Sequence, residues 1–226
     1  MSKSSTKTST RIAIGIIAGL MLFSTVGLYA MIVMGGQDQR REIQRQEELD
    51  AELQALLRER QEKVDEQTRE LSDEWFEVLN PFRDRVRSFN ANVRELATED
   101  LVVGDGDKIA EDTEYSAFYI GWLPNGEVFD SSFDNGSLGA PIPSGNLITG
   151  WTEGVVGMRF GGIRMITMPS DMAYGEMGAG TEGEPGHIAP NTPLRFIVLI
   201  IPRVEEIPFS DRILELFEEL HGDMGW

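Results

Sequence analysis

Residues 150–158 read GWTEGVVGM and place one tryptophan, Trp151, among three glycines. Glycine has no side chain, so it lets neighbouring backbone approach closely. The surrounding stretch NLITGWTEGV, residues 146–155, fits one short helix. No obvious catalytic group stands beside the tryptophan, and taken alone such a ring is more often part of a plain core than of a binding pocket.

Short apolar runs and turn pairs surround this helix once GDGD at 104–107 has changed the character of the chain. The Asn-Gly pair of PNGEVF is typical of a tight hairpin. We therefore predict a mostly antiparallel sheet with little helix, an α+β fold. The predicted strands are EYSAFYIGW (114–122), GIRMITMPS (162–170) and PLRFIVLII (193–201).

Composition excludes several kinds of chemistry. The chain has no cysteine and only two histidines, His187 and His221, which excludes disulfides and leaves a zinc site dependent on carboxylates. We therefore expect neither a metal nor a cofactor. Residues 95–226 contain 6 basic and 23 acidic side chains. Such a charge repels phosphate backbones, so nucleic acid is not expected as a partner.

The N-terminal region contains 23 consecutive uncharged residues, 12–34. At about 1.5 Å per residue this stretch crosses a hydrocarbon layer of about 30 Å, so we predict an uncleaved transmembrane helix. A cleaved signal peptide is the alternative. Lys3, Lys7 and Arg11 indicate a cytoplasmic tail over 1–11 and an extracytoplasmic remainder, which makes this a single-pass protein of the cell membrane.

Residues 37–94 contain no glycine and are predicted to form a helical stalk, kinked near Pro81. Its second half has apolar residues at alternating steps of four and three, which is the heptad pattern of a coiled coil. This heptad stripe consists of Trp75, Leu79, Phe82, Val86, Phe89, Val93 and Leu96. The pattern leaves open whether the stripe forms a homodimer, pairs with another helix or folds back onto the C-terminal domain.

The last segment, 207–226, is predicted to form an amphipathic helix that begins after Ser210 as N-cap. The residues expected on its apolar face are Ile213, Leu214, Phe217 and Leu220.

Residues 95–206 resemble the FKBP-type peptidyl-prolyl cis-trans isomerases. Five pieces occur in the order of that family, and together they are far more specific than any one alone. They are EDLVVGDG, FYIGWLPNGEVFDSS, LITGWTEGVVGM, GGIRMITMPSDMAYGEMGAG and IAPNTPLRFIVLI. The resemblance implies an antiparallel half-barrel sheet wrapped around a short helix, and catalysis of X-Pro isomerisation in protein folding.

The resemblance also implies an apolar pocket with Trp151 as its floor. The residues expected to act in catalysis are Tyr119, Phe129, Asp130, Trp151, Tyr174 and Phe196. Leu147, Ile148 and Ile188 are expected to bind substrate. The implied partners are proline-containing polypeptides and macrolides similar to rapamycin, besides the membrane through 12–34. A non-catalytic binding module and a tethered chaperone or assembly protein are the alternative functions.

Two segments depart from the family pattern. The loop 133–146 lacks one pocket aromatic that the family commonly has, unless Phe133 or Ile142 replaces it. The loop after AYG is lengthened by GTEGEPG, residues 180–186, and we expect it to overhang the pocket beside His187.

Overall fold

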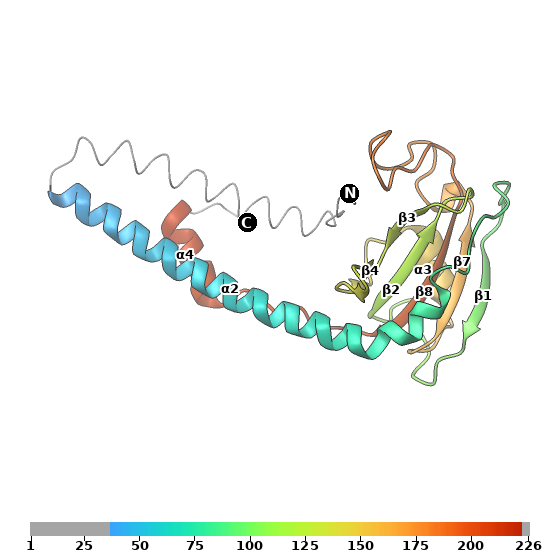
Figure 1. Ribbon diagram of the computed structural model, residues 1–226, viewed down its shortest axis with the longest axis horizontal. Coiled ribbons are helices and arrows are strands. Elements are labelled where there is room, and N and C mark those ends of the chain that lie inside the picture. Colours follow the sequence, from blue (N-terminus) through green and yellow to red (C-terminus); the bar gives the residue numbers. More distant parts are fainter. Residues whose placement is uncertain (1–36, 223–226) are drawn as a thin grey trace. The chain divides into compact units, whose positions relative to one another are not determined.

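The computed structural model of the protein describes residues 37–222, and Figure 1 shows their arrangement. The helices of this range are α2 (Gln37–Leu79), α3 (Thr149–Val155) and α4 (Asp211–His221), with 3-10 turns η1 (Asn80–Phe82) and η2 (Ser170–Met172). Its strands are β1 (Ala97–Val102), β2 (Tyr115–Trp122), β3 (Val128–Ser131), β4 (Phe133–Asp134), β5 (Ser137–Leu138), β6 (Ile142–Pro143), β7 (Ile163–Met168) and β8 (Leu194–Pro202).

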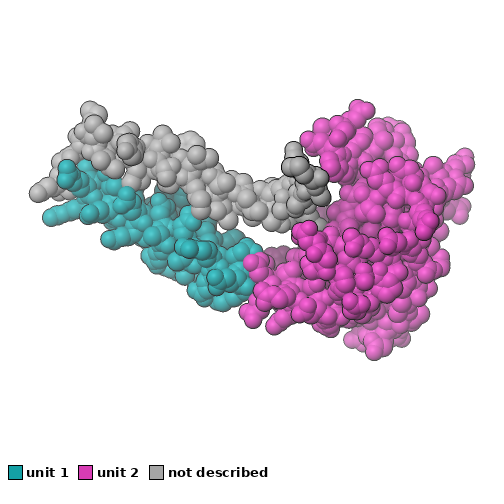
Figure 2. Space-filling view, viewed as in Figure 1, with its two compact units in different colours: residues 1–63, 207–226 teal, residues 64–206 magenta. Residues whose placement is uncertain are grey.

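The chain divides into two compact units, coloured separately in Figure 2. Of the described residues, the first unit combines 37–63 with 207–222, and the second comprises residues 64–206. The second unit contains the sheet, α3 and the last turns of α2.

The main sheet has strand order β1-β7-β8-β2-β3, and β6 adds to the edge of β2. All of these pairings are antiparallel, which confirms the predicted α+β fold. The long central pair β2–β8 aligns Ala117 with Ile200 and Trp122 with Arg195. Strands β4 and β5 form a separate two-stranded sheet in the loop after β3.

Both faces of this sheet are covered, which explains why every residue of β2 is buried. Side chains of a strand alternate between faces. Ala117 and Tyr119 therefore join the cluster around α3, whereas Phe118 and Ile120 join a second cluster on the opposite face. The absence of polar alternation in YSAFYIGW follows from this double burial.

Five of the seven residues of the heptad stripe lie in the second of these clusters, whereas Leu96 packs against the first. Trp75 and Leu79 of α2, together with Phe82, Val86 and Phe89, pack against the face of the sheet opposite α3. Of the three alternatives, the stripe therefore folds back onto the C-terminal domain. The second unit begins at Val64, so the predicted domain boundary at residue 95 lies inside it.

The prediction of a helical stalk over 37–94 was wrong for its last part, residues 83–94. Helix α2 ends at Leu79, and the chain continues through a 3-10 turn with Pro81 near its start. Proline has no backbone N–H and disfavours helical geometry in the residue before it. Residues 83–94 contain no helix, so the stripe there packs from an irregular chain.

In the first unit, α4 confirms the predicted helix but not all of its apolar face. The Ser210 hydroxyl caps the helix by accepting a hydrogen bond from the Ile213 N–H at 3.3 Å. Ile213 and Leu216 are buried against Leu53 of α2, whereas Leu214 is half exposed. The prediction of Leu214 on this face was wrong, because positions 213, 216, 217 and 220 form the contacting side.

No helix within residues 37–222 is long and apolar enough to cross a bilayer. The stretch predicted to do so, 12–34, lies outside the described residues.

Candidate functional site

Helix α3 is held tightly against β7 by its two glycines. A Cβ atom at Gly150 would lie 2.6 Å from the Met168 sulfur, and one at Gly154 would lie 2.7 Å from Cγ2 of Ile166. Real Cβ atoms essentially never make contacts this short. The expected close packing of the glycine-flanked helix is confirmed, and it buries Trp151 to 2% exposure.

Aromatic rings from three strands surround Trp151. Phe196 of β8 lies 5.2 Å from it, and Tyr119 of β2 lies 5.4 Å from it, both edge to face between ring centroids. Phe129 of β3 makes a similar contact with Phe196 at 5.5 Å. Such pairs add about 0.5–1.5 kcal/mol each beyond the burial of their area. Four of the predicted residues thus form one ring cluster.

The remaining apolar candidates border the same cluster. Ile188 is buried in it, and Leu147 and Ile148 pack against it immediately before α3 begins. The Trp151 N–H donates to the Ile148 carbonyl at 2.9 Å, which fixes the start of the helix relative to these walls.

Asp130 is joined to the ring cluster through Tyr119, whose hydroxyl donates a short hydrogen bond to the Asp130 carboxylate. The second carboxylate oxygen accepts from the Ser131 N–H at 2.8 Å. Burial, followed by the charge of Asp130, raises the pKa of Tyr119 far above its ordinary value. Tyr119 therefore remains a protonated donor at any physiological pH.

Tyr174 is the candidate most open to solvent, with 40% of its surface exposed. It follows η2 in the loop that leads to Ile188. Burial raises the pKa of its hydroxyl, and the nearby negative charge of Asp130 raises it further. This phenol is thus a neutral hydrogen-bond donor beside the cluster.

Two residues that hold helix α3 in place, Tyr115 and Arg164, were not predicted from the sequence. Tyr115 accepts a hydrogen bond from the Trp151 indole N–H at 3.2 Å. Arg164 donates to the carbonyls of Gly154 and Val156, at 2.9 and 3.0 Å, and pairs with Asp100 at 2.6 Å. It therefore neutralises the C-terminal end of α3. A charged residue inside the apolar strand GIRMITM was the signal that could have revealed it.

The two candidates for the missing aromatic lie on opposite sides of the sheet. Ile142, in the edge strand β6, packs against the larger apolar cluster that contains these rings. Phe133 instead packs against Phe76 of α2, with ring centroids 5.6 Å apart. The backbone N–H of Leu138 donates to the buried Ser72 hydroxyl of α2 at 2.9 Å. The loop 133–146 is therefore attached to α2, and the aliphatic side chain of Ile142 lies on the pocket side.

Within the described residues, no group of three or more histidines, cysteines or acidic residues is placed to hold a metal ion.

Comparison with known proteins agrees with this geometry. The sequence pattern of the family FKBP-type peptidyl-prolyl cis-trans isomerase matches residues 106–201. An FK506-binding protein of Neisseria meningitidis serogroup A is 42% identical over 107 residues, which are 47% of this chain and 94% of that protein. The chloroplastic peptidyl-prolyl cis-trans isomerase FKBP13 of Arabidopsis thaliana is 38% identical over 115 residues, covering 48% of this chain and 55% of that protein. A chain that covers nearly a whole relative at this identity belongs to the FKBP-type peptidyl-prolyl cis-trans isomerase family.

Proposed function

We propose that this isomerase accelerates X-Pro isomerisation in exported or cell-surface polypeptides while residues 12–34 anchor it in a membrane. Uncatalysed isomerisation takes tens to hundreds of seconds, so it limits the folding of newly exported chains. The ring cluster around Trp151 is the single observation on which the catalytic part of this proposal rests.

The proline ring is bound over Trp151, beside Phe129 and Phe196, with Ile188 and the pair Leu147 and Ile148 as walls. The barrier of about 18–20 kcal/mol comes from amide resonance, which favours the planar and polar amide. An apolar pocket removes the water that stabilises this planar form. Complementarity to the twisted amide then lowers the barrier, and each 1.36 kcal/mol gives about tenfold in rate.

The polar residues orient the substrate without exchanging protons with it. The Tyr174 hydroxyl donates to a substrate carbonyl, because it is a neutral, partly exposed donor beside the cluster. Asp130, held by Tyr119 and by the Ser131 N–H, presents a fixed negative charge to the twisted amide. No nucleophile is required, since no covalent bond is broken.

Membrane anchoring is supported by the 23 uncharged residues of 12–34 and by the basic residues before them. The N-terminus is then cytoplasmic and the isomerase domain extracytoplasmic. The chain is expected to resist alkaline extraction from membrane vesicles, and deletion of 12–34 should release it. Protease added to right-side-out vesicles should digest the domain only if it faces outward. Extraction of the intact chain at high pH would contradict the anchor.

The catalytic proposal is tested with the full chain in mild detergent. NMR exchange spectroscopy measures the cis-trans rate of an X-Pro peptide with and without enzyme, and a macrolide similar to rapamycin should abolish the acceleration. Val103→Ala is the matched control, since Val103 is 74% exposed and outside the cluster. A Trp151→Leu chain that isomerises as fast as this control would remove Trp151 from the proposed site.

A further inference from the structure

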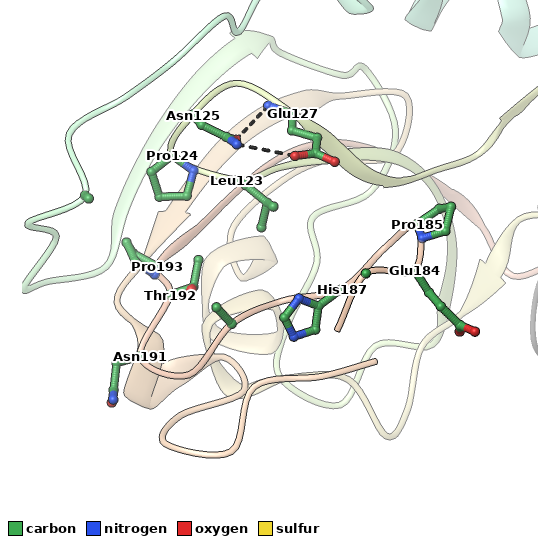
Figure 3. A pocket seen from close by; sticks show the side chains of 13 residues that line it. Leu123, Pro124, Asn125, Glu127, Glu184, Pro185, His187, Asn191, Thr192 and Pro193 are labelled. Atoms are coloured by element: carbon green, nitrogen blue, oxygen red, sulfur yellow. Dashed lines mark hydrogen bonds between the residues drawn. The ribbon is translucent and has the colours of Figure 1, made fainter. Parts of the chain in front are cut away.

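A second pocket of about 760 Å³ opens beside the ring cluster, within the unit 64–206. It is bounded by the hairpin turn between β2 and β3 and by the lengthened loop before β8 (Figure 3). In this view Pro124 and Pro193 lie on one side of the space, and His187 and Pro185 lie on the other.

A single extended segment separates this pocket from the ring cluster. Ile188 forms an isolated antiparallel bridge with Ala179 and is buried in the cluster. Side chains alternate in extended backbone, so its neighbours His187 and Ala189 are presented to the opposite side. Both of them line the second pocket. Because consecutive Cα atoms are about 3.8 Å apart, a bound polypeptide leaves the proline site within a few residues of this pocket.

The lining is amphipathic. Leu123 and the three prolines 124, 185 and 193 supply apolar walls. The carboxylate of Glu127 is at the hairpin end of the pocket and accepts a hydrogen bond from the Asn125 side-chain amide at 3.3 Å. A lysine or arginine side chain has the matching form, because its aliphatic stem packs on apolar surface while its charged head reaches a polar rim.

The charge of the pocket also favours a lysine or arginine side chain. Its lining includes the carboxylates of Glu127 and Glu184 but neither lysine nor arginine. The unit that contains it, residues 64–206, has 10 basic against 25 acidic side chains. A cation is therefore drawn towards this pocket and an anion is repelled.

We propose that this pocket is a subsite for a lysine or arginine side chain of the substrate, located near the isomerised proline. The isomerase then prefers X-Pro bonds that have a basic residue nearby. This inference rests on the proposed function, since it concerns the polypeptide held in the ring cluster.

The test uses peptides with one X-Pro bond and a lysine placed in turn at the second, third and fourth position on either side of the proline. Each is paired with the same peptide carrying norleucine, which keeps the stem and removes the charge. At one of these positions, we expect lysine to raise kcat/KM of the full chain about two- to fivefold, which is the range of a solvent-exposed ion pair. The preference should weaken as salt is raised from 20 to 300 mM.

Glu127→Gln alone should weaken this preference, and Glu127→Gln combined with Glu184→Gln should abolish it. Glu182→Gln is the matched control, because Glu182 is exposed in the lengthened loop but does not line the pocket. It should retain the lysine preference. Equal rates for lysine and norleucine at every position, or a preference that survives in the double variant, would overturn the subsite while leaving the isomerase function intact. Failure to accelerate any peptide would instead overturn the function and the subsite together.

Discussion

Replacing Leu79 by alanine should destabilise the isomerase domain, although Leu79 lies outside the segment that matches the family. Its side chain is fully buried, at the end of α2, in the cluster opposite α3. Leucine-to-alanine changes at such sites cost about 2–5 kcal/mol through lost transfer energy and the cavity left behind. We expect about 3 kcal/mol, because β2 and β8 pack against Leu79 from a rigid sheet that cannot close the cavity.

The measurement is urea unfolding of the full chain in detergent, followed both by isomerase activity and by tryptophan fluorescence. With a slope of about 2 kcal/mol per molar urea, a loss of 3 kcal/mol lowers the activity midpoint by about 1.5 M. Leu214→Ala is the matched control, since Leu214 is half exposed on α4 and its loss should change stability by less than about 0.5 kcal/mol. If Leu79→Ala left the activity midpoint in place, α2 would be a separate stalk and the packing argument would be wrong.

Four further outcomes are expected. Trp151→Leu should weaken macrolide binding at least about fivefold in a fluorescence titration, because two edge-to-face ring contacts are lost while the domain stays folded. Gly154→Ala should lower the free energy of unfolding by about 1–3 kcal/mol because its Cβ would clash with Ile166, whereas Gly139→Ala, whose nearest neighbour would be 3.7 Å away, should change it little. Arg164→Met should cost about 1.5–3 kcal/mol in thermal unfolding, since it leaves the carbonyls at the end of α3 and the Asp100 carboxylate without their charged donor. Activity should be flat from pH 6 to 9, and a bell-shaped activity profile would contradict a mechanism without proton transfer. Stability should fall above about pH 10, because the unfolded chain there releases the Tyr119 proton that the folded chain retains. Tyr119→Phe should make that fall in stability shallower.

The ring cluster could be predicted from the sequence because its residues lie in motifs that resemble, in order, those of the FKBP-type isomerases. The helix containing Trp151 needs glycines at 150 and 154 to approach β7, and only that approach brings the ring beside Tyr119 and Phe196. The supports of the site could not be found in this way. Tyr115 looks like any aromatic strand residue, and its hydrogen bond to Trp151 depends on how β2 and α3 pack.

The pocket of Figure 3 was beyond sequence reasoning for a related reason. Its walls come from the turn after β2 and from the loop before β8, which are separated by more than fifty residues along the chain. The sequence showed that the loop was lengthened near His187 but not what it would enclose. Which side of Ile188 each neighbour faces is decided by the bridge to Ala179, a pairing across the lengthened loop that no sequence motif indicates.

The heptad stripe shows how two incomplete signals support the same arrangement. The stripe alone fits a dimer, a helix pair or a fold-back equally well, because all three bury one apolar side of a helix. The strand YSAFYIGW, in contrast, is apolar or small at nearly every position, and such a strand requires cover on both faces of its sheet. The short helix α3 covers one face. The second face must be covered by another part of the same chain or by a partner. The stripe ends at Leu96, immediately before β1 begins at Ala97, and is the nearest apolar surface of sufficient length. The sheet needs apolar cover on its second face, and the stripe offers an apolar surface next to it. Together these two features favour the fold-back, in which Trp75 and Leu79 share one cluster with Phe118 and Ile120.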